Sequence, residues 1–136
     1  MSRHCFARVT CAVLTIFFLA SGCSKPTHES VQKDRIGKIN ELTAILKSIT
    51  DEASANAAVP KIKAVGEEMK ALNQKADALP KLSPDEQKTL AQKQEREALD
   101  AQSGMTKEIA RLMMNPALIK PISDAMKDLA DTRSAP

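Results

Sequence analysis

An apolar stripe between residues 55 and 79 constrains the fold of this chain more than any other feature of its sequence. The apolar side chains recur at alternating steps of three and four residues, the heptad period that keeps one face of an α-helix against a partner helix. The stripe consists of Ala55, Ala58, Ile62, Val65, Met69, Leu72, Ala76 and Leu79. One helix cannot bury such a stripe alone, so we expect the rest of the chain to supply partner helices.

Two further long helices are expected, one on each side of the stripe in the sequence. Residues 29–49 place isoleucine and leucine side chains on one broad helical face. Ser83 and Glu86 form a capping box, and Pro84 suits the first position of a helix over residues 84–114. Because the connection before Pro84 is short, we expect this helix to fold back antiparallel on its predecessor. Its inward stripe is expected to contain Leu90, Ala91, Gln94, Ala98, Ala101, Met105, Ile109, Leu112 and Met113.

The remaining segment predicts one short helix. Asn115-Pro116 is expected to end the third helix, and Pro121 is expected to begin the last one. The sequence therefore predicts an all-α fold, an antiparallel helical bundle in up-down-up order. It comprises three long helices (about 29–49, 55–79 and 84–114) and a short C-terminal helix (about 121–131).

Pro60 leaves the start of the second helix open. A proline beyond the first turn removes a backbone hydrogen bond and costs about 3 kcal/mol. Either the regular helix begins near Val59, or a short turn at residues 53–58 is kinked against it. Thr50, Asp51 and Ser54 are suitable N-cap residues for the earlier start.

The first 22 residues have the layout of a secretory signal peptide. Arg3 and Arg8 provide a positive start, residues 9–20 are apolar and uncharged, and small residues follow. The apolar run has about 12 residues, whereas a helix needs roughly 20 to cross a bilayer. We therefore expect residues 1–22 to be a cleaved signal peptide.

The leader ends in Leu19-Ala20-Ser21-Gly22-Cys23. This segment resembles the cleavage box of bacterial lipoproteins, although Ala20 stands where that box usually has a branched aliphatic residue. The resemblance implies that Cys23 is lipidated and becomes the first residue of the mature chain. The alternative is an ordinary secretory leader cut near Gly22, with an incidental cysteine.

Lipidation would define the domain organisation and the location of the protein. Residues 23–30 would be the lipidated cysteine and a polar tether, and residues 31–136 the helical bundle domain. Two or three acyl chains provide a lasting membrane anchor, so the domain would be tethered to the cell envelope and face the periplasm. Ser24 is not aspartate, which in Gram-negative lipoproteins implies the outer membrane.

The mature sequence lacks the usual components of a catalytic or metal site. It has one histidine, one cysteine, three glycines and no aromatic residue, and it contains no phosphate-binding loop or nucleophile elbow. Removing the leader takes away Arg3 and Arg8 and no acid, which lowers the formal charge from +3 to +1. We therefore expect no enzymatic activity, no cofactor, no metal and no nucleic-acid partner.

The leading interpretation is a membrane-anchored, non-enzymatic lipoprotein whose bundle serves envelope structure or protein contacts, including contacts in a homo-oligomer. The alternative is a periplasmic carrier or chaperone-like protein that binds an apolar ligand or segment between its helices. Methionines gather toward the end expected to point away from the membrane, where they either form a partner surface or close the core. The candidate surface comprises Met105, Met113, Met114, Leu118, Ile119 and Met126.

Overall fold

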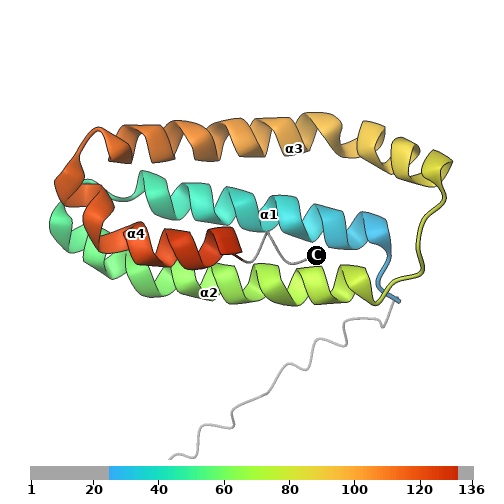
Figure 1. Cartoon of the computed structure of the whole chain (residues 1–136). Helices are drawn as coiled ribbons and strands as arrows, with labels where there is room; N and C mark the ends of the chain where they lie inside the picture. The colour runs from blue at the N-terminus through green and yellow to red at the C-terminus, as the bar shows by residue number, and fades with distance from the viewer. Residues whose placement is uncertain (1–24, 132–136) are drawn as a thin grey trace, which may run out of the picture.

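The computed structural model describes residues 25–131, which form four helices and no strand (Figure 1). The helices are α1 (His28–Lys47), α2 (Glu52–Asp77), α3 (Pro84–Met113) and α4 (Pro116–Asp131). The predicted all-α fold and the up-down-up order of the three long helices are confirmed. The predicted signal peptide and Cys23 lie outside the described residues.

Helix α1 lies between α2 and α3 (Figure 1). It packs against both of them. Helix α4 also packs against α2 and α3 but does not contact α1. Helices α2 and α3 lie on opposite sides of α1 and do not pack on each other, so the prediction that the third helix folds back on the second is wrong. The connection between them instead passes the first turn of α1, where His28 Nε2 lies 2.7 Å from the carbonyl oxygen of Pro80.

Helix α2 takes the earlier of its two possible starts. Asp51 is the N-cap, because its carboxylate accepts a hydrogen bond from the Ser54 backbone N–H at 2.7 Å. Pro60 lies inside the helix on its solvent-exposed side. A proline is tolerated there because water can hydrate the carbonyl of Asn56 that loses its intrahelical donor.

Helix α4 begins five residues earlier than predicted, which corrects the interpretation of Pro121 as a helix start. Pro116 is the first helical residue, and Asn115 Oδ1 accepts a hydrogen bond from the Ala117 backbone N–H at 3.2 Å. Proline at the first position loses no intrahelical bond. Pro121 lies inside the helix, and the carbonyl of Ala117 that it leaves without an intrahelical donor belongs to an exposed residue.

The fourth helix covers only part of the bundle. It has 16 residues against 30 in α3, or about 24 Å against about 45 Å of helix length. We call the part covered by α4 the four-helix half, and the part with the start of α1, the end of α2 and the start of α3 the three-helix half (Figure 1). The main apolar core comprises Leu42, Leu46, Ile49, Ala55, Ala58, Ile62, Val65, Met105, Leu112, Leu118, Ile122, Ala125 and Leu129.

Burial along the predicted stripes follows this division. In α2, Ile62 and Val65 are buried, whereas Ala76 and Leu79, beyond the end of α4, are only half-buried. In α3, Ala91 and Met113 are exposed, so the prediction of these two as inward residues is wrong. Ala91 follows Leu90 and Met113 follows Leu112, and one residue along a helix is a rotation of about 100°, which turns the side chain toward solvent.

Arg111 connects α3 to the C-terminal end of α1. Its guanidinium donates to the carbonyl oxygens of Leu46 at 2.9 Å and Ile49 at 3.1 Å, and its Nε donates to Glu108 at 2.7 Å. The last carbonyls of a helix have no intrahelical donor and carry partial negative charge, so a cation stabilises them. Arg111 thereby fixes the turn between α1 and α2 to α3.

Candidate functional site

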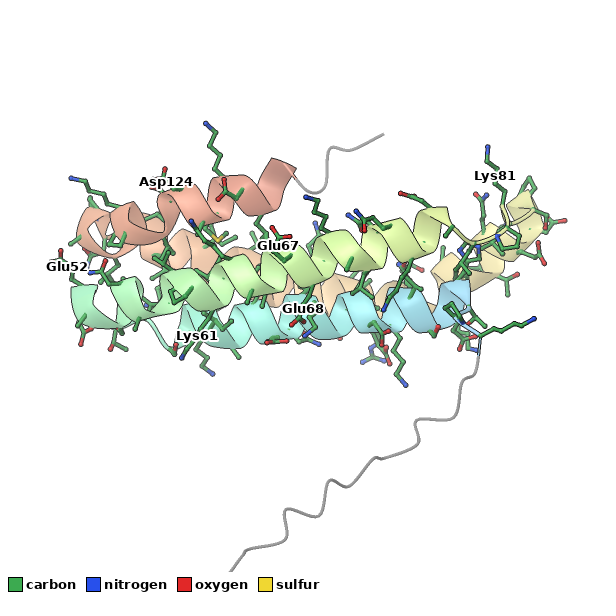
Figure 2. The ribbon with its side chains drawn as sticks, turned by 90° about the horizontal axis from the view of Figure 1, so that it is seen from below. Glu52, Lys61, Glu67, Glu68, Lys81 and Asp124 are labelled. Atoms are coloured by element: carbon green, nitrogen blue, oxygen red, sulfur yellow. The ribbon has the colours of Figure 1, made fainter. Side chains whose placement is uncertain are left out.

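The predicted lipid site lies just ahead of the described residues. Cys23 precedes the first described residue, Lys25, by two positions, and α1 begins at His28. The hydrogen bond between His28 and Pro80 places the start of α1 and the α2–α3 connection at the same end of the bundle, as predicted. Figure 2 shows Lys81 at this end and Glu52 at the other.

The structure divides the predicted methionine surface. Met113 and Met114 are 66% and 87% exposed at the turn between α3 and α4. Met105 and Leu118 are instead buried in the apolar core, and neither belongs to an exposed surface of the monomer. Ile119 and Met126 are half-buried and pack against that core. Of the six predicted surface residues, Met113 and Met114 are therefore the exposed ones.

A groove that was not predicted opens in the three-helix half, immediately beyond the end of α4. It has a volume of about 270 Å³, is open to solvent, and lies between α2 and α3 with α1 as its floor. Its lining residues come from all three helices: Gln32, Arg35, Ile36, Ile39, Met69, Asn73, Ala98, Gln102 and Met105. We call it the Arg35 groove.

The wall that α2 contributes to this groove continues the surface on which α4 packs. A Cβ atom at Gly66 would lie 3.4 Å from the Leu129 side chain of α4, so Gly66 faces α4. Met69 and Asn73 follow Gly66 by three and seven residues, the spacing of one helical face. The same face of α2 thus contacts α4 in one half of the bundle and lines an open groove in the other.

Among the residues that the structure describes, Arg35 is the only charged one that lines the groove. The guanidinium is half-buried and donates a hydrogen bond to the side-chain oxygen of Asn73. No carboxylate among the side chains that the structure describes forms an ion pair with it. A cation in this position is only partly hydrated and retains unused donors.

A second cleft, of about 600 Å³, lies between α1 and α2 on the opposite side of α1. Lys38 forms ion pairs there with Glu41 and Glu68, and these hydrogen bonds, with Glu41 the larger cause, raise the pKa of Lys38 above its ordinary value. Figure 2 shows Glu68 on the side of α2 next to α1. Three charged side chains of this cleft, Lys38, Glu41 and Glu68, are therefore already paired with one another, whereas Arg35 has no ion-pair partner among the described residues.

Gln94 is a buried polar residue of the three-helix half, 6% exposed. Its amide nitrogen donates to the backbone oxygen of Glu29 at 3.2 Å. Its Oε1 atom is buried without a hydrogen-bond partner among the described residues. The interface between α1 and α3 in the three-helix half therefore contains a buried acceptor without a partner among the described residues, whereas the buried core of the four-helix half is apolar.

Two searches of the described residues bear on function. No group of three or more histidine, cysteine, aspartate or glutamate residues among them is arranged to hold a metal ion. None of the helices between residues 25 and 131 combines the length and apolar character needed to cross a membrane. Comparison of the chain with protein-family models, curated proteins and solved structures finds no match.

Proposed function

We propose that this chain is a lipid-anchored, non-enzymatic bacterial lipoprotein whose helical bundle serves protein contacts in the cell envelope. The observation that carries the proposal is the segment Leu19-Ala20-Ser21-Gly22-Cys23, which directly follows a leader with a positive start and an apolar run. Lipid on Cys23 attaches the bundle to a membrane through a tether that leads into α1. The domain faces the periplasm, and Ser24 favours the outer membrane.

The anchor is tested by replacing Cys23 with serine and fractionating the cells. We expect the wild-type protein in the membrane fraction and Cys23→Ser in the soluble or unprocessed pool, with loss of the acyl mass from the N-terminal peptide. Cys11→Ser is a matched control, because Cys11 belongs to the leader and is removed by cleavage. Identical fractionation and mass for all three proteins would overturn the anchor and favour an ordinary secretory leader.

The proposal of protein contacts draws support from the incomplete bundle. Helices α2 and α3 each present a face that α4 covers for only part of its length, and the uncovered part is the Arg35 groove. In vivo crosslinking from a photoreactive residue at Gln102, in the groove, should give a discrete higher-mass band. The same residue at exposed Lys70, on the outer side of α2, is the control and should give none.

A further inference from the structure

We propose that the Arg35 groove binds an amphipathic helix of a partner protein, with an acidic side chain of that helix paired to Arg35. The inference deepens the proposed function, because it names the surface and the chemistry of the contact. It requires that the bundle make protein contacts but does not depend on the lipid anchor.

The shape of the groove favours a helix. Helix α4 already shows what this surface accepts, since its apolar residues pack on α2 and α3, with Leu129 against Gly66. Beyond Leu129 the same face of α2 continues as Met69 and Asn73. A second helix placed end to end with α4 would repeat the packing of α4 along the rest of the bundle.

The composition of the groove fits an amphipathic surface. Ile39 and Met69 supply partly exposed apolar area, and methionine adapts its shape to the side chains that it meets. Ala98 on α3 is small, which allows a partner backbone to approach closely. The volume of about 270 Å³ lies below the range of about 300–1,000 Å³ typical of small-molecule pockets, so the groove suits a row of side chains better than an enclosed ligand.

The charge of the groove selects an acidic partner. A helix laid over Arg35 removes water from a guanidinium that has only a neutral amide, Asn73, as its partner among the described residues. Burial of an unpaired charge is costly, whereas a carboxylate can accept two parallel hydrogen bonds from a guanidinium. An occupant that carries aspartate or glutamate beside its apolar stripe therefore binds better than a neutral or basic one.

The test uses the full chain, purified in detergent, and three fluorescent 14-residue peptides. Each peptide is an alanine-rich helix with leucines at positions 1, 5, 8 and 12 and a single variable residue, Glu, Gln or Lys, at position 4. We expect the Glu peptide to bind at least about tenfold more tightly than the Gln peptide, and the Lys peptide more weakly still. Arg35→Glu should reverse the order and favour the Lys peptide, whereas Lys70→Glu, the matched control, should preserve it.

A second pair of variants keeps the proposal falsifiable if Arg35→Glu unfolds. Ala98→Phe fills the groove and should weaken binding of the Glu peptide at least tenfold. Ala110→Phe, at an exposed position of the same helix, should leave its affinity unchanged. Equal affinities of the three peptides for the wild-type protein would overturn the proposal. Arg35-dependent binding of laurate with no binding of the Glu peptide would also overturn it, in favour of a fatty-acid carboxylate. Neither result bears on the lipid anchor, which Cys23→Ser tests separately.

Discussion

The two halves of the bundle are built from the same helices but differ in what fills the space between them. In the four-helix half, aliphatic side chains from α1, α2, α3 and α4 form one continuous core in which Leu46, Ile49 and Ile62 have no exposed surface. In the three-helix half, Gln94 is buried, Arg35 is half-buried, and a groove remains open. The position of the end of α4 accounts for this difference.

The comparison indicates a division of roles. Aliphatic burial stabilises a bundle in proportion to the apolar area removed from water, so most of the stability should come from the four-helix half. Polar groups that are only partly satisfied contribute little to stability but can recognise a partner. A half that is incompletely filled in the monomer is therefore the place to look for binding.

The largest expected effect is the loss of stability when a buried leucine is replaced by alanine, which should differ between the two halves. Leu46→Ala in the closed core should lower the free energy of unfolding by about 4 kcal/mol, because the surrounding helices cannot collapse into the cavity. Leu72→Ala should cost about 2–3 kcal/mol, since Leu72 is 7% exposed and borders the cleft between α1 and α2. Urea titrations measure both values, and exposed Lys70→Ala is the control. Equal losses for the two leucines would contradict the division.

The two arginines provide the next comparison. Arg111→Met should cost about 2 kcal/mol, because the carbonyls of Leu46 and Ile49 lose a charged donor. Arg35→Met should change stability by less than about 1 kcal/mol, since it removes one hydrogen bond to Asn73 from an open groove. The free energy of unfolding of Arg111→Lys should lie between those of Arg111→Met and the wild type, because lysine keeps the charge but lacks the planar guanidinium that reaches both carbonyls. A larger loss of stability for Arg35→Met than for Arg111→Met would contradict this and mean that the groove stabilises the monomer.

Gln94→Leu probes the polar interface of the three-helix half. Leucine removes the buried acceptor that lacks a partner and adds apolar contact between α1 and α3, so the free energy of unfolding should rise by about 1 kcal/mol. The amide hydrogen bond to Glu29 is lost in the same change, which limits the gain. Thermal unfolding measures the shift. A clear destabilisation would show that water or another donor satisfies Gln94 Oε1 in solution.

The smallest effect compares the helix caps, one in each half. Hydrogen bonds from Ser54 lower the pKa of Asp51, and those from Ser83 lower the pKa of Glu86. Both carboxyls are therefore more acidic when folded, so their contribution is complete above the unfolded values of about 4 and is lost as the pH falls through the folded values. Asp51→Asn and Glu86→Gln should each make the melting temperature less dependent on pH between about 5 and 3. An unchanged pH profile in both variants would contradict the cap contribution.

The sequence predicted those features that depend on local patterns. The heptad positions Ile62 and Val65 are buried, and the Ser83–Glu86 box begins α3 as expected. Capping and periodicity act within a few residues, so they can be recognised without knowledge of the partners. Pro116 and Pro121 show the limit, because either proline could begin a helix; the Asn115 side chain at the helix start and the packing of Leu118 in the core favour the earlier one.

Features that depend on helix placement could not be predicted. Both α1 and α2 present apolar stripes, so sequence alone does not decide which of them α3 covers. The Arg35 groove exists because α4 ends near Gly66, and Met105 is buried because it lies on the same face of α3 as Leu112. No local pattern marks the role of Arg111, because its carbonyl partners are 62 and 65 residues away in the sequence.

The position of α1 between α2 and α3 would determine how the bundle responds to a pull on its N-terminus. A tether that entered at residue 25 would pull on α1, which packs against both α2 and α3. Traction along the axis of α1 must slide both interfaces at once, and the contact between His28 and Pro80 resists the first displacement. A chain anchored through α1 would therefore carry tension through the interfaces of α1 with α2 and α3.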